Sequence, residues 1–116
     1  MKFKQRDVVY ITVELPDGKV LEHPYVIISS GKVNSIENSY LGVMITGTIS
    51  NDKYSFDLTD SMFERPLNKI SQIRIRLISS FNESQVRGSI FSRMKPIPFK
   101  NLVDEITSVV LSIDRD

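Results

Sequence analysis

The chain of 116 residues contains no cysteine and a single histidine. The absence of cysteine excludes disulfide bonds, a thiol nucleophile and cysteine-based zinc sites. One histidine without cysteine leaves too few of the usual ligands for a transition-metal site, so we expect neither a metal nor a cofactor. Oxygen and nitrogen side chains should therefore supply any chemistry that the protein performs.

The sequence also lacks a strong charge of one sign and any long apolar run. Its net charge is +1, so an anionic partner would have to be bound by a local cluster of cations rather than by the overall field. The first residues, Met1–Arg6, contain no apolar stretch of the kind found in signal peptides, and no segment is long enough to span a membrane. We expect a cytoplasmic protein, without membrane contact, folded as the single domain 1–116.

The first half of the chain predicts a β-hairpin. Asp7–Leu15 and Val20–Ser29 are rich in β-branched and aromatic residues, and Pro16–Gly18 between them is a turn sequence. Pro24 lacks an N–H, so we expect it to open a buried strand rather than lie inside it. His23 would then lie at the entrance of that strand.

Four further strands are predicted, at Tyr40–Thr48, Tyr54–Leu58, Gln72–Ser79 and Gln85–Phe91. A glycine inside the first of these, Gly42, indicates a bulge or a close backbone approach. The Gln72–Ser79 segment alternates cleanly, which would place its isoleucines on one face and its arginines on the other.

The remaining segments predict a loop and a closing helix. Ser30–Asn38 is polar and should form a loop with at most one helical turn, and Pro66 argues against a central strand in Met62–Asn68. Beyond Pro98, apolar residues recur at steps of three and four, which is typical of an amphipathic helix. These are Phe99, Leu102, Val103, Ile106, Val109, Val110 and Ile113. The predicted fold is mainly β, a small, strongly bent sheet or barrel covered by a C-terminal helix.

Two polar residues lie at the ends of predicted core strands. His23 can act as a general acid or base, or it can simply be a partly buried histidine that hydrogen-bonds to the backbone. Thr46 can position a phosphate, or it can satisfy its hydroxyl locally. The sequence alone leaves both alternatives open.

A basic cluster is predicted on one strand face. Arg74 and Arg76 are two residues apart, and Lys69, Arg87 and Arg93 occur nearby in the sequence. Side chains at this spacing can grip a polyanion together, or they can form a solvated face paired with neighbouring carboxylates. No glycine-rich phosphate loop, catalytic triad or metal-ligand cluster accompanies them.

Four short motifs occur in the order found in one known family. They are Gln5–Tyr10 ("R-G-D-[IV]-[VY]" in the family), His23–Ser29 ("R-P-[VY]-[VL]-[IV]-[IV]-[ST]"), Val43–Thr46 ("[VA]-x-[IP]-[TI]") and Ser71–Arg74 ("[ED]-Q-[IP]-R"). Together with the closing helix they resemble the MazF/PemK/Kid toxins of type II toxin–antitoxin systems over nearly the whole chain.

The resemblance implies an SH3-like small barrel of the CcdB/PemK type, which usually forms a homodimer. It implies a metal-independent endoribonuclease that cleaves single-stranded RNA, in which the 2′-hydroxyl of the substrate attacks the adjacent phosphate to give a 2′,3′-cyclic phosphate. It also implies a cognate antitoxin protein, part of which becomes ordered as it covers the RNA site.

The family motifs can be transferred residue by residue. The family arginine before the proline is replaced here by His23, and the carboxylate that some members carry before the glutamine is missing, with Ser71 in its place. The resemblance thus implies catalytic roles for His23, Thr46 and Arg74, and RNA binding by Lys69, Ser71 and Arg76. The alternative is a catalytically inactive small barrel that binds RNA or a protein partner.

Overall fold

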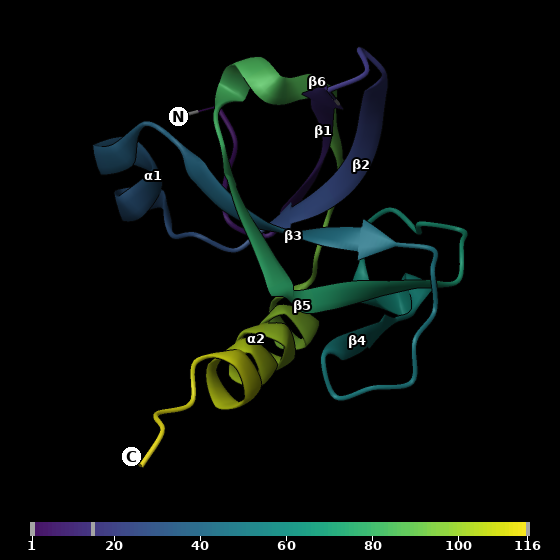
Figure 1. The fold of residues 1–116 in the computed structure, drawn as a ribbon, viewed down its shortest axis with the longest axis vertical. Coiled ribbons are helices and arrows are strands. Elements are labelled where there is room, and N and C mark those ends of the chain that lie inside the picture. Colours follow the sequence, from purple (N-terminus) through teal and green to yellow (C-terminus); the bar gives the residue numbers. More distant parts are fainter. Residues whose placement is uncertain (1, 15, 116) are drawn as a thin grey trace.

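A six-stranded antiparallel sheet dominates the computed structural model, which describes residues 2–14 and 16–115 (Figure 1). The strands are β1 (Asp7–Glu14), β2 (Val20–Ile27), β3 (Tyr40–Thr46), β4 (Ser55–Leu58), β5 (Ser71–Phe81) and β6 (Val86–Arg93). Their spatial order is β4-β5-β3-β2-β1-β6. The helices are α1 (Gly31–Glu37) and α2 (Pro96–Glu105), which continues as a π-helical turn (Ile106–Val110); 3₁₀ turns occur at Asp60–Met62 and Glu83–Gln85.

The sheet is bent but not closed. Within the described part of the chain, β4 and β6 each pair with one neighbour only and form its two edges. After β4 the chain crosses to the end of β6, where Phe63 forms an antiparallel bridge with Met94 and the N–H of Lys95 donates to the carbonyl of Met62 at 2.8 Å. The predicted mainly-β fold with a C-terminal helix is confirmed, although its barrel remains open.

Two hydrophobic clusters lie on opposite faces of the sheet. One packs α2 against the sheet and includes Val8, Ile73 and Leu102, and the other surrounds Tyr40 and Phe81. Gly42 belongs to the second region, where a Cβ atom on it would lie 2.8 Å from the Phe81 ring. The close approach predicted from this glycine is therefore confirmed.

Both helices differ from the expectation. Ser30–Asn38 forms α1 rather than a loop, because the Ser30 hydroxyl accepts a hydrogen bond from the N–H of Val33 and Asn38 ends the helix in the left-handed conformation (φ +51°). The amide of Asn34 is fully buried and bonds to both the hydroxyl and the carbonyl of Ser29. At the other end, the predicted apolar stripe stops early, since Ile113 is 94% exposed.

None of the helices described is both long enough and apolar enough to cross a bilayer.

A buried tyrosine holds the N-terminal segment against the sheet. Tyr40 Oη accepts from the N–H of Phe3 at 3.1 Å and donates to Glu83 Oε1 at 2.7 Å. Burial and the neighbouring Glu83 carboxylate raise the pKa of Tyr40 to about 12. In the unfolded chain the tyrosine loses its proton near its ordinary pKa of 10.0. The stability that the buried phenol contributes therefore falls as the pH rises from about 10 to about 12.

Tyr40→Phe should accordingly lower the free energy of unfolding by about 1–2 kcal/mol at neutral pH, because it leaves the Phe3 N–H without its acceptor. It should also flatten the decline of stability above pH 10, which urea unfolding at a series of pH values measures. Tyr10→Phe is the matched control, and equal flattening in both variants would contradict the role assigned to Tyr40.

Candidate active site

An opening between β2 and β3 begins at Pro24. The two strands pair from Ile27 to Tyr25, and the N–H of Ile28 donates to the carbonyl of Leu41 on β3 at 2.9 Å. Backbone N–H groups alternate sides along a strand, so the nitrogen of residue 24 also faces β3, but proline carries no hydrogen there. Pairing with β3 therefore ends at Tyr25.

Pro24 thus lies within β2, paired with Tyr10 of β1, and does not open the strand as the sequence predicted. The proline is tolerated because β2 is an edge strand on the β3 side at this point, where no ladder hydrogen bond is needed. His23 is also inside the strand, opposite Ile11, and is half-buried.

A cavity of about 430 Å³ lies at this opening, and we call it the His23 cavity. Its apolar wall includes Tyr10, Pro24 and Ile45. Its polar residues come from the first half of β2, from the end of β3 and the loop after it, and from the start of β5 and the residues before it; they are Glu22, His23, Thr46, Thr48, Lys69 and Ser71. Four of the six residues predicted as site residues therefore meet in one place.

Local hydrogen bonds fix two of the hydroxyls that line the His23 cavity. Thr46 Oγ1 accepts from the N–H of Thr48 at 3.1 Å, and Ser71 Oγ donates to the carbonyl of Lys69 at 3.2 Å. Each hydroxyl keeps further hydrogen-bonding capacity for a ligand. The local role and the ligand-binding role considered for Thr46 are thus compatible.

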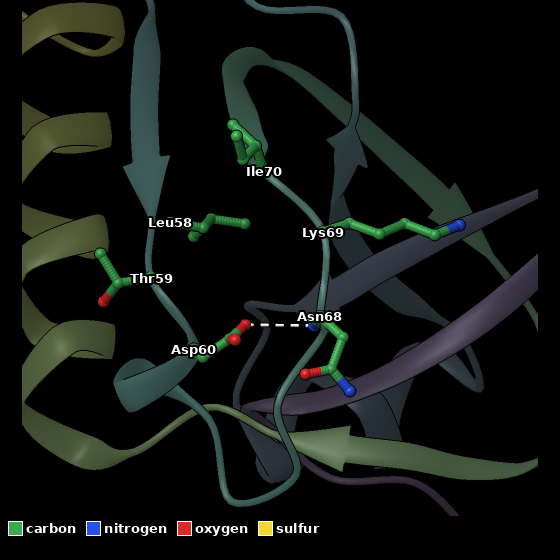
Figure 2. A pocket seen from close by; sticks show the side chains of 6 residues that line it. All are labelled: Leu58, Thr59, Asp60, Asn68, Lys69 and Ile70. Atoms are coloured by element: carbon green, nitrogen blue, oxygen red, sulfur yellow. Dashed lines mark hydrogen bonds between the residues drawn. The ribbon is translucent and has the colours of Figure 1, made fainter.

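Lys69 brings a positive charge to the His23 cavity. Its backbone separates this cavity from a neighbouring one of about 400 Å³, where the N–H of Asn68 donates to Asp60 Oδ1 at 3.1 Å. Figure 2 shows the Lys69 side chain pointing away from Leu58 and Asp60. The ammonium group is exposed and therefore available to an anion.

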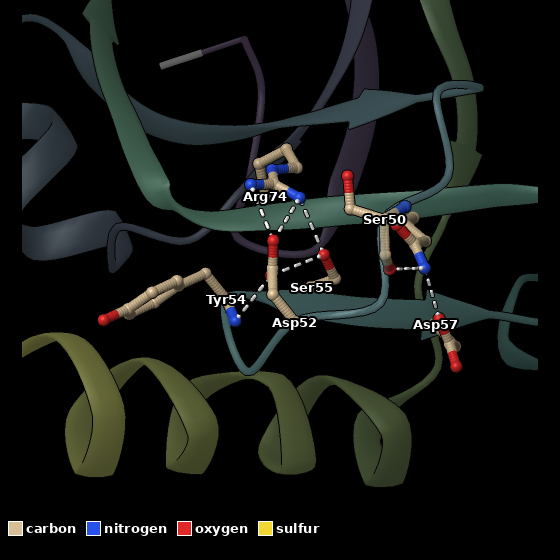
Figure 3. Close-up of polar contacts among 7 residues, drawn as sticks. Ser50, Asp52, Tyr54, Ser55, Asp57 and Arg74 are labelled. Atoms are coloured by element: carbon tan, nitrogen blue, oxygen red, sulfur yellow. Dashed lines mark hydrogen bonds and ion pairs between the residues drawn. The ribbon is translucent and has the colours of Figure 1, made fainter.

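The two predicted arginines do not line the His23 cavity. Arg74 is engaged with the β3–β4 loop: its guanidinium donates to Ser55 Oγ at 2.8 Å and pairs with Asp52 Oδ2 at 3.3 Å (Figure 3). Desolvation acts to raise the pKa of the Asp52 carboxyl, but the Tyr54 N–H, Ser55 and Arg74 outweigh it and lower that pKa. Arg76 is exposed on β5.

A second residue of β5 holds the same loop. The Gln72 amide donates to the carbonyl of Ser50 at 2.9 Å and to Asp57 Oδ1 at 2.7 Å, and its oxygen accepts from the N–H of Ser50 at 2.9 Å. This loop begins with Gly47 and Thr48, which line the His23 cavity. Gln72 and Arg74 therefore support one wall of the cavity from behind.

The solved structures with which the chain can be superposed include MazF proteins. No protein-family model matches the chain, and no curated protein is similar to it in sequence. A MazE–MazF complex from Deinococcus radiodurans superposes with a TM-score of 0.77 at 9% identity, over 97% of this chain and 100% of that one. The chain has the fold of the MazF toxins.

Two mycobacterial structures agree. The toxin MazF-mt6 from Mycobacterium tuberculosis gives a TM-score of 0.69 at 15% identity, over 94% of this chain and 100% of that one. An endoribonuclease in complex with its cognate antitoxin, from a mycobacterial species, gives 0.73 at 12% identity, over 97% and 98%. At these identities the likeness concerns the fold, and the MazF-like fold predicted from four short motifs is confirmed.

Two residues of the candidate site were not predicted from the sequence. Glu22 lines the His23 cavity, and its carboxylate lies 3.6 Å from Arg87 Nε on β6. Gln72 supports the loop from a position inside one of the four motifs. Only Glu22 had a usable signal, because it directly precedes His23 in a strand that carries few other polar groups. In the described ranges, no cluster of three or more histidine or carboxylate side chains could hold a metal ion.

Proposed function

We propose that this protein is the toxin of a type II toxin–antitoxin system and cleaves single-stranded RNA without a metal. The observation that carries the proposal is the convergence of His23, Thr46, Lys69 and Ser71 on one cavity within a MazF fold. The cavity offers a titratable ring, a cation and two hydroxyls, which suit a phosphodiester.

The reaction requires one proton to leave and one to arrive. The 2′-oxygen of the RNA forms a bond to phosphorus while the bond to the 5′-oxygen of the next nucleotide breaks, giving a 2′,3′-cyclic phosphate. The Glu22 carboxylate takes the proton of the 2′-hydroxyl, and the protonated His23 imidazole gives one to the leaving 5′-oxygen. Lys69 stabilises the charge on the non-bridging oxygens, and Thr46 and Ser71 orient the phosphate.

The direct test incubates the purified protein with a long single-stranded RNA in the presence of a chelator. We expect fragments that end in a 2′,3′-cyclic phosphate, and no cleavage where a 2′-deoxynucleotide replaces the reacting one. Cleavage of the 2′-deoxy strand at the same rate would contradict the mechanism. Binding without cleavage, weakening as salt is raised, would instead support the RNA-binding module considered above.

The proposal extends to partners. Two of the similar structures are complexes, one named MazE–MazF and the other an endoribonuclease with its cognate antitoxin. We propose that an antitoxin protein likewise covers the His23 cavity of this chain, and that the protein forms a homodimer. Sedimentation equilibrium measures whether the protein forms a homodimer, and a monomer at every concentration would contradict this expectation.

Arg74 and Arg76 have different places in this proposal. Arg74 acts through the β3–β4 loop rather than on the phosphate, and Arg76, exposed on the same strand, contributes to RNA binding. Arg74→Ala and Asp52→Asn break the same ion pair from its two sides. Both should slow cleavage by a similar factor of about 10, since each releases the cavity wall. A loss in Arg74→Ala far beyond that in Asp52→Asn would show that the guanidinium contacts the substrate.

A further inference from the structure

A basic cavity lies at the other end of β2. Arg6 is placed there by its N–H, which donates to the carbonyl of Ile27 at 2.8 Å. His23 is four residues earlier on β2, which corresponds to a separation of about 13 Å along the strand. This cavity has a volume of about 430 Å³, and we call it the Arg6 pocket. The residues used in the argument that follows are Lys4, Arg6, Gly31, Ser35 and Arg93.

The Arg6 pocket carries excess positive charge. Lys4, Arg6 and Arg93 reach it from two segments almost ninety residues apart. The carboxylate of Asp7 lies beside them; it is buried and is 3.3 Å from Arg93 Nε. Three cations against one carboxylate leave two positive charges around the cavity.

Arg6 adopts a backbone conformation that favours glycine. Its φ angle is +78°, in the left-handed region, which is unfavourable for a residue with a side chain. One guanidinium nitrogen donates to the carbonyl of Met94 at 2.9 Å. A guanidinium has five N–H donors, so this single bond leaves capacity for a ligand.

Arg93 provides a second incompletely used guanidinium. Its Nη2 donates to the carbonyl of Gln5 at 3.3 Å, and its buried Nε faces the Asp7 carboxylate at the same distance. A guanidinium has four further N–H donors on its two terminal nitrogens, so these contacts leave capacity for a ligand.

We infer that the Arg6 pocket binds a phosphate group. A phosphate presents several oxygens in different directions, and the pocket is lined by Lys4 and Arg6 of the N-terminal segment, Ser35 of α1 and Arg93 of β6. The backbone at Gly31 leaves the pocket free of a side chain on that side. The ligand is a phosphate of an RNA strand or of a free nucleotide, and the site does not depend on cleavage at the His23 cavity.

Titrations followed by amide chemical shifts test the inference. The probes are inorganic phosphate, a nucleoside 5′-monophosphate and a short single-stranded RNA. Each bound species should shift the amides of Arg6, Ser35 and Arg93 saturably. Saturation by all three probes identifies a general phosphate site, and saturation by RNA alone identifies a strand-specific one. The absence of a saturable shift at these amides with all three would overturn the proposal.

Matched variants localise the effect. Lys4→Ala and Arg6→Gly should each weaken binding about tenfold or more, because each removes a charged donor. Glycine tolerates the conformation at position 6, so that variant should stay folded. Lys19→Ala, an exposed change of equal charge in the hairpin turn, should bind like the wild type. Equal weakening in all three would indicate a general charge effect and overturn the site.

The two proposals fail independently. His23→Gln should abolish cleavage while leaving the shifts at Arg6 and Ser35 intact. If the wild type cleaves no RNA but still shows these shifts, the nuclease proposal fails and the phosphate site remains. If RNA is cleaved and no probe shifts these amides, the phosphate site fails alone.

Discussion

Replacing His23 by glutamine is expected to lower the rate constant of RNA cleavage by a factor of about 100 to 10,000, the usual contribution of a general acid. Glutamine can keep a hydrogen bond but cannot deliver a proton to the leaving oxygen. Single-turnover cleavage of a fluorescent RNA measures the loss. Because His23 is half-buried and its strand is held by backbone pairing with β1, the variant should unfold at the same urea concentration as the wild type.

A second variant tests the assigned base. Glu22→Gln should also lower the rate constant of RNA cleavage by a factor of about 100 to 10,000, because glutamine cannot take the proton of the 2′-hydroxyl. An unchanged rate constant in either variant would contradict the assigned roles.

Leu102→Ala is expected to give the largest loss of stability. The Leu102 side chain is fully buried where α2 packs against the sheet, among residues such as Val8 and Ile73. Truncating a buried leucine leaves a cavity and costs about 2–5 kcal/mol. Chemical denaturation should show this loss as a lower midpoint with an unchanged slope.

Ile97→Ala on the same helix is the matched control. Ile97 is 77% exposed, so its truncation should change the free energy of unfolding by less than about 0.5 kcal/mol. A comparable loss in the two variants would show that α2 is not anchored through Leu102.

The sequence predicted what depends on local patterns. β-Branched and aromatic residues on either side of a turn sequence indicated the hairpin of β1 and β2, and Gly42 indicated a close contact, which Phe81 makes. The three- and four-residue steps indicated α2 but extended it to Ile113, since periodicity does not show where packing ends. Helix α1 was missed because its capping by Ser30 and Asn38 occurs in a short polar segment that also suits a loop.

The sequence predicted only the part of the candidate site that follows from the positions of residues along the strands. Thr46 and Ser71 lie at strand ends, and His23 lies inside β2 next to the point where its pairing with β3 stops, so the three meet at one opening of the sheet. Arg74 was assigned to the same site from its motif, but its direction depends on Asp52 and the loop in which that carboxylate lies. Contacts of this kind join residues distant in sequence, so a pattern along the chain does not contain them.

Pro24 has a consequence for how this protein can vary. The opening between β2 and β3 exists because Pro24 has no N–H to donate to β3. No side chain of the His23 cavity is needed to keep these two strands apart. Substitutions at positions 23 and 46 can therefore alter the chemistry of the cavity without extending the pairing of β2 with β3. An arginine at position 23 could therefore be replaced by a histidine, as the resemblance implies here, while the opening between β2 and β3 keeps its width.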